Sequence, residues 1–241
     1  MSHTEPATVR QVDLPGQTHV AEGPYDQTGM YVMHHAFRRD LDRFLSAVRT
    51  TPVGEAEVWA ALARRWSTFE EVLHHHHVVE DTSIWPALVA HADAAGADDD
   101  RATLEAMEAE HAAIDPALDA TRAAFAAMRG HPCVDHRNAL DVRLSSLRQG
   151  LLDHLRHEET EALPLLQRTM TPEEWEAAEK AAAKGYPARM VPFLVPWVAD
   201  GLPADVVGRL LGDAGRVYGL VLRLFRPRFE ARERVAFRYA G

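Results

Sequence analysis

The sequence predicts an all-α protein: an up-down-up-down four-helix bundle with additional helices at its C-terminal end. Four long segments repeat their apolar residues with a period close to 3.6, breaks rich in proline or glycine separate them, and no segment alternates like a strand. Amphipathic helices joined by short connections pack as a bundle. We therefore expect an irregular leader at 1–25, the bundle at 26–168 and a helical extension at 169–241.

The four helices of the bundle are predicted at about residues 28–49, 55–84, 99–128 and 134–163. Turn residues at 51–54 end the first helix. Pro86 should end or kink the second, with a short helical extension beyond it, because proline lacks an N–H and clashes with the carbonyl four residues back. A loop at 94–100 leads to the third helix, which Pro116 should bend, and Pro164 marks the end of the fourth.

Each predicted helix carries its apolar residues on one face, at every third or fourth position. These stripes are Met30, Phe37, Leu41, Phe44 and Val48; Val58, Leu62, Trp66, Phe69 and Leu73; Leu104, Met107, Ile114, Leu118, Phe125 and Met128; and Leu140, Leu144, Leu147 and Leu151. They are the predicted core of the bundle.

A further helix is predicted to start at Thr171, which can cap it, with Pro172 at its first position and Glu174 at its third. Residues 185–203 contain several prolines and glycines and should be broken. A last helix is expected at about 204–225.

The C-terminal region is basic, whereas the rest of the chain is acidic. Residues 201–241 carry a net charge of +4 against −14 for the remainder, and Arg209, Arg216 and Arg223 recur every seven residues. One interpretation is a basic amphipathic helix that lies on an anionic membrane or docks a partner or a second copy of the chain. The interpretation we favour is a helix that packs on the bundle and exposes its arginines.

Composition excludes several classes of protein. The chain has 241 residues and a formal charge of −10, which argues against nucleic-acid binding. A single cysteine, Cys133, excludes an internal disulfide framework and a cysteine-rich zinc site. No signal-peptide pattern and no run of about 18 apolar residues is present, so we expect a cytoplasmic protein without a transmembrane segment.

Histidine carries the functional signal, because 14 are present and four of them are consecutive at 74–77. His76 and Glu80 continue the apolar stripe of the second helix, and His154 and Glu158 continue that of the fourth; His34 and His111 lie within the stripes of the other two. Buried polar groups without partners each cost about 1–3 kcal/mol. Metal ions would remove this cost, since carboxylates and neutral imidazoles from facing helices are the donors of bundle metal sites.

The same pattern occurs twice. His76-x-x-x-Glu80-Asp81-x-x-x-Trp85-Pro86 aligns without gaps on His154-x-x-x-Glu158-Glu159-x-x-x-Leu163-Pro164, and the region of His34 aligns on that of His111. A helical hairpin was thus duplicated, which places an approximate two-fold axis through the predicted site.

The donor set limits the choice of metal without settling it. Histidine and carboxylate without thiolate suit iron, manganese or zinc, and two carboxylates able to bridge favour two ions over one tetrahedral zinc. His77, beside the stripe, is either a seventh ligand or a neighbour of the ligands; Asp115 and His35 are further alternatives. Asp81 and Glu159 are placed to hydrogen-bond ligand imidazoles or to face solvent.

Taken together, these motifs resemble the hemerythrin-type HHE cation-binding domain over residues 28–166. The resemblance implies a four-helix bundle with a non-haem centre of two iron ions, held by His34, His76, Glu80, His111, His154 and Glu158, in which the two glutamates bridge. Zinc and manganese are the less favoured metals. The chain departs from the respiratory hemerythrins, which have a second histidine where Asp115 stands and an aspartate in the role of Glu158.

Three functions are compatible with these observations. The first is a protein that binds or senses dioxygen or redox state. The second is an enzyme that consumes peroxide or nitric oxide at an open metal position. The third is a helical interaction protein whose metal is structural. We rank binding first, because the sequence shows no dedicated general acid or base.

Overall fold

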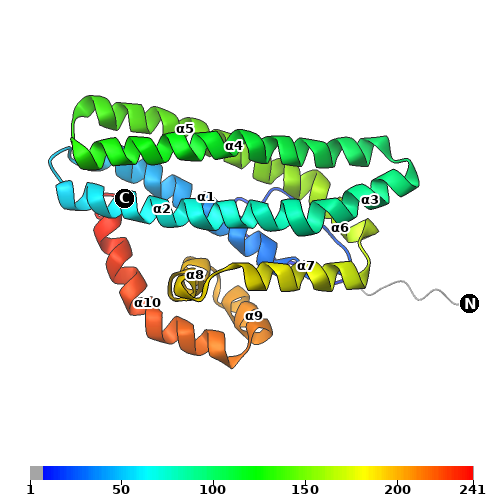
Figure 1. Cartoon of the computed structure of the whole chain (residues 1–241). Coiled ribbons are helices and arrows are strands. Elements are labelled where there is room, and N and C mark those ends of the chain that lie inside the picture. The colour runs from blue at the N-terminus through cyan, green and yellow to red at the C-terminus, as the bar shows by residue number, and fades with distance from the viewer. Residues whose placement is uncertain (1–7, 241) are drawn as a thin grey trace, which may run out of the picture.

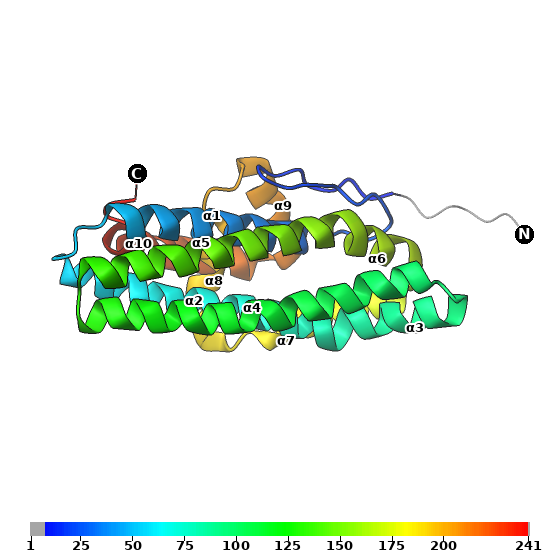
Figure 2. The same cartoon turned by 90° about the horizontal axis from the view of Figure 1, so that it is seen from above.

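The computed structural model describes residues 8–240, apart from the side chains of residues 185, 213, 214 and 216, and this part of the chain is helical without strands. The bundle consists of α1 (Thr28–Thr50), α2 (Ala56–Val79) continued by α3 (Trp85–Ala95), α4 (Asp98–Gly130), and α5 (Val134–His157) continued by α6 (Leu163–Thr169). Figures 1 and 2 show these rods side by side along a common direction. The predicted all-α bundle is confirmed.

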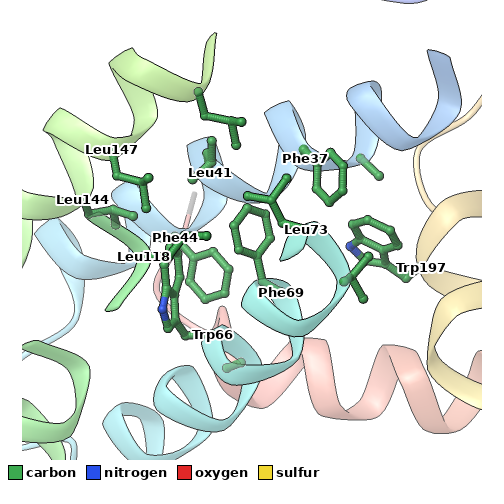
Figure 3. Close-up of a cluster of buried hydrophobic side chains, with 14 of the residues drawn as sticks. Phe37, Leu41, Phe44, Trp66, Phe69, Leu73, Leu118, Leu144, Leu147 and Trp197 are labelled. Atoms are coloured by element: carbon green, nitrogen blue, oxygen red, sulfur yellow. The ribbon is translucent and has the colours of Figure 1, made fainter. Parts of the chain in front are cut away.

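The bundle core is aromatic at its centre. Phe44 contacts both Trp66 and Phe69 with ring centroids 5.1 and 5.8 Å apart, and Trp66 stacks on Phe125. Figure 3 shows this cluster between α1 and α2, with Leu144 and Leu147 of α5 closing it. All residues of the predicted stripes are buried except Met30, which is half-buried.

Two prolines expected to kink or end helices instead follow π-helical turns. These turns are η1 (Glu80–Ile84) before Pro86 and η2 (Glu158–Ala162) before Pro164. In each, the glutamate carbonyl accepts from the N–H five residues on, Trp85 or Leu163. The wider turn suits a chain that must avoid the clash between a proline ring and the carbonyl four residues back. The fourth helix therefore does not end at Pro164 but continues as α6.

The helix predicted to start at Thr171 is α7 (Pro172–Gly185), and a capping box between Thr171 and Glu174 stabilises its N-terminus. After it come η3 (Ala188–Met190) and α8 (Val191–Ala199), which Figure 1 shows beside the bundle. The prediction of one last helix at 204–225 is wrong. Gly215 divides α9 (Ala204–Ala214) from α10 (Arg216–Ala236). Its φ angle of +80° is a backbone conformation that residues with L side chains rarely adopt. The spaced arginines therefore do not form one helix face.

The extension packs on the bundle. Trp197 of α8 lies against Phe37 of α1, and α10 contacts both α2 and α8. A buried ion network joins the parts: Arg65 of α2 pairs with Asp40 of α1 and with Glu233 of α10. Docking of a partner or a second copy through the basic C-terminal helices stays a prediction. None of the described helices is both long and apolar enough to cross a bilayer.

Candidate metal centre

The bundle rods bring seven side chains that could hold metal ions together in the core, in two adjacent groups. The first group consists of His34, His76, Glu80 and Glu158, and the second of His77, His111 and His154. Within each group, one donor atom from every residue lies within 4.8 Å of the others, and all seven residues are buried. All six residues of the predicted set are thus gathered at one place, together with His77.

The two glutamates lie between the groups. The carboxylate oxygens of Glu80 are 3.0 Å from Nε2 of His76 and 3.6 Å from Nε2 of His111. One carboxylate oxygen of Glu158 is 3.2 Å from Nε2 of His34 and 3.9 Å from Nε2 of His154. Each carboxylate therefore faces imidazoles of both groups, and from this position it could serve two metal ions.

The local backbone explains why Glu80 and Glu158 take equivalent positions. Each glutamate lies four residues after a histidine, one helical turn further along the same face, and is the first residue of a π-helical turn. Since η1 and η2 come from the two copies of the sequence repeat, the carboxylates reach the centre from opposite helices. Figures 1 and 2 show α2–α3 and α5–α6 as separate rods of the bundle.

Carboxylates outside the cluster orient three of the imidazoles. Nδ1 of His34 donates to Glu159 (3.0 Å), Nδ1 of His111 to Asp81 (2.8 Å), and Nδ1 of His154 to Glu110 (2.8 Å). With Nδ1 engaged in this way, Nε2 of each ring is turned to the centre. The hydrogen-bonding interpretation of Asp81 and Glu159 agrees with these contacts.

Sequence reasoning missed Glu110, Arg38 and Thr18. Arg38 makes a bidentate contact of 2.8 and 2.9 Å to Glu159, and the backbone N–H of Thr18 donates to the same carboxylate. Arg38 could have been found, because it lies four residues after His34 on the same helix. Glu110 directly precedes His111 and lies off the stripe, and Thr18 lies in the leader, so neither carries a periodic signal.

Many of the cluster's polar atoms have no hydrogen-bond partner. They are Nε2 of His34 and His76, both ring nitrogens of His77, and both carboxylate oxygens of Glu80 and of Glu158. Such atoms are costly to bury, at about 1–3 kcal/mol each. They all belong to donors of the kind that bind iron, manganese or zinc, so the residues present fit a pair of cations.

Burial and neighbouring charges set the protonation of the centre. Burial lowers the pKa of His76 to about 3 and that of His77 well below its ordinary value, so both imidazoles are neutral and keep a free lone pair. Burial, reinforced by the charge of Glu158, raises the pKa of Glu80 well above its ordinary value. Burial also disfavours the anion of Glu158, but the adjacent His34 outweighs this effect and lowers the pKa of Glu158 to about 2.

The structure distinguishes the three alternative ligands of the sequence analysis, His77, His35 and Asp115. His77 stacks on His111 with centroids 4.0 Å apart and belongs to the second group. His35 lies outside both groups, half-buried, with Nδ1 3.4 Å from a carbonyl of the leader. Asp115 is also outside, with its side chain 51% exposed. The core face of α4 continues from His111 through the buried Ile114, which turns Asp115 outward.

The third imidazole of the second group comes from α2 and not from a second histidine on α4. His77 of α2 faces His111 and His154 and brings the second group to three imidazoles. Its neighbour His74, in the same run of four, is exposed, and His75 packs against Tyr186. The apolar stripe had already distinguished His76, and only the tertiary arrangement separates His77 from His74 and His75.

The comparisons with known proteins bear on this arrangement. A family model described as the hemerythrin HHE cation binding domain matches residues 28–166. That range runs from the start of α1 into α6 and leaves the helices from α7 onward outside the match. No curated protein and no solved structure matches the chain.

Proposed function

The chain belongs to the hemerythrin HHE cation-binding family, and from this premise we propose that its metal centre holds two iron ions and binds or senses dioxygen or redox state. The residue cluster and the family support a metal-binding protein. Iron, the number of ions and the ligand dioxygen are the proposed part.

The two groups of side chains suggest how the ions would be divided. One ion would be held by His77, His111 and His154 and the other by His34 and His76, while Glu80 and Glu158, which face imidazoles of both groups, would serve both ions. The ion of His34 and His76 would then have one imidazole fewer than the other ion. Because iron bound by nitrogen and oxygen donors accepts about six ligands, the ion of His34 and His76 is the one with more room for a small molecule.

The unpartnered polar atoms of the cluster carry this proposal. A purely structural bundle would not retain buried carboxylates and imidazoles without hydrogen bonds, since each costs free energy. When bound, iron ions supply reversible oxidation and reduction and an open position for a ligand. Glu159, Asp81 and Glu110 hold the imidazoles in the orientation that points Nε2 inward.

A second candidate is an enzyme that consumes peroxide or nitric oxide at the same centre. A cavity that reaches His76 and Glu80 favours it, because a substrate has a route to the ion with more room. Consumption of either compound above that of a Glu80→Ala variant would support turnover, and consumption equal to it would leave a binding role.

The deciding experiment loads the full chain with iron, counts the metal and records ultraviolet–visible spectra of the reduced protein before and after exposure to air. We expect close to two irons per chain and charge-transfer bands that change with air. His154→Ala should lower the iron content, whereas His91→Ala, which alters a half-exposed histidine paired with Glu174, should not. Well under one iron per chain, or equal iron in both variants, would overturn the proposal.

A further inference from the structure

A cavity of about 300 Å³ lies between α1, the junction of α2 and η1, and α7. Its floor includes His76 and Glu80. His76 keeps 9% of its side chain exposed, whereas His34 and Glu158 are fully buried. The cavity therefore approaches the candidate metal centre from the side of His76, which is the group with two imidazoles rather than three.

The walls of this cavity are mainly apolar. Met30 and Met33 come from α1, Val79 and Ile84 from α2 and η1, and Trp175 from α7. Methionine side chains adapt to the shape of what they contact. One water molecule occupies about 30 Å³ of liquid, so the cavity has several times the room that a diatomic gas or hydrogen peroxide needs. Its volume lies at the lower end of the range of small-molecule sites.

The described lining of the cavity offers an anion no lysine or arginine. Asp26 and Glu179 are among the lining residues, and Asp26 is paired with Arg209, which is not among them. A cation would in turn be repelled by bound metal and desolvated by apolar walls.

The wall from α7 lies outside the family match, which ends at residue 166. Trp175 stacks on Tyr25 with centroids 5.4 Å apart, and the capping box at Thr171 and Glu174 fixes the start of the helix. Part of the extension thus encloses the approach to the metal centre, which gives this region a role the sequence did not reveal.

We infer that this cavity binds a neutral organic molecule with an apolar body, such as an organic hydroperoxide or alcohol, whose oxygen-bearing head group reaches the ion held by His34 and His76. The inference rests on the proposed function, because it takes His76 and Glu80 as metal ligands. It defines the class of ligand by the size and the apolar walls of the cavity and by the lack of lysine and arginine among its described lining residues.

The test uses 2-phenyl-2-propanol, a neutral aryl alcohol, titrated into the iron-loaded full chain by calorimetry and followed in the charge-transfer spectrum. Gly29→Leu places a side chain at the lining residue Gly29, where an added Cβ meets no heavy atom within 4 Å. Gly150→Leu is the matched control, since Gly150 is helical, equally free of neighbours and remote from the cavity lining.

We expect saturable binding of one alcohol per chain, at least tenfold weaker binding in Gly29→Leu, and no change in Gly150→Leu. All three proteins should keep the same iron content and the same spectral response to nitric oxide, which is small enough to pass. No binding, equal binding in both variants, or tighter binding of benzoate than of the alcohol would overturn the inference. If the nitric oxide response is intact and alcohol binding is absent, the cavity inference fails alone; if iron does not load, the proposed function fails.

Discussion

Replacing Glu80 with methionine should make the metal-free protein more stable and the metal-loaded protein less stable than the natural chain. Glu80 is only 1% exposed, and neither carboxylate oxygen has a hydrogen-bond partner. Burial and the charge of Glu158 raise its pKa, which shows that the metal-free pocket disfavours its anion. Methionine has a similar length and no polar oxygen, so it removes these costs without opening a cavity.

The size of the effect follows from the two oxygens. At the lower end of about 1–3 kcal/mol for each buried unsatisfied group, the substitution should raise the free energy of unfolding of the metal-free protein by about 2 kcal/mol. For a chain of this length, 1 kcal/mol shifts the melting temperature by about 2–4 °C, so an increase of about 4–8 °C is expected. With metal present, the natural chain should gain about 4 kcal/mol when free metal exceeds Kd about a thousandfold, and the variant should gain far less.

The assay is thermal unfolding followed by circular dichroism, with and without a chelator. Glu161→Met is the control, because Glu161 is an exposed glutamate on η2, the equivalent π-helical turn of the other repeat, and should change stability by no more than about 0.5 kcal/mol. A lower melting temperature of metal-free Glu80→Met than of the natural chain would refute the reasoning about unpartnered oxygens. Equal stabilisation of both by metal would show that Glu80 is not a ligand.

Other substitutions separate the parts of the structure. Glu159→Gln should weaken metal binding about 10–100-fold, measured by competition with a chelator, because the carboxylate orients His34; unchanged affinity would contradict that role. His77→Ala should lose metal and His74→Ala should not, as metal analysis would show, and equal retention would exclude His77 as a ligand. Burial disfavours the anion of Asp40, but Arg65 and Arg39 outweigh this and lower its pKa, so its contribution to stability is complete above the unfolded pKa near 4 and is lost as pH falls through the folded value. Asp40→Asn should therefore flatten the acid limb of stability against pH in urea titrations, and an unchanged slope would contradict this.

The periodicity of the sequence was sufficient for the bundle, because packing amphipathic helices requires their apolar residues to recur on one face. It was also sufficient to bring His76 with Glu80, and His154 with Glu158, onto single faces, since residues four apart lie one turn apart. The boundaries around prolines were less accurate. A proline can be accommodated by a break, a kink or a π-helical turn, and the residues before Pro86 and Pro164 do not distinguish these outcomes.

The sequence by itself thus determined the four rods of the bundle, their buried stripes and six of the seven clustered side chains, because all of these follow from the spacing of residues within one helix. Only the tertiary structure decided that His77 and not Asp115 completes the cluster, that Glu110 orients His154, and that α7 walls the approach to His76. These features depend on the relative rotation and position of different helices. That arrangement is set by packing across the whole core, which no local pattern of residues encodes.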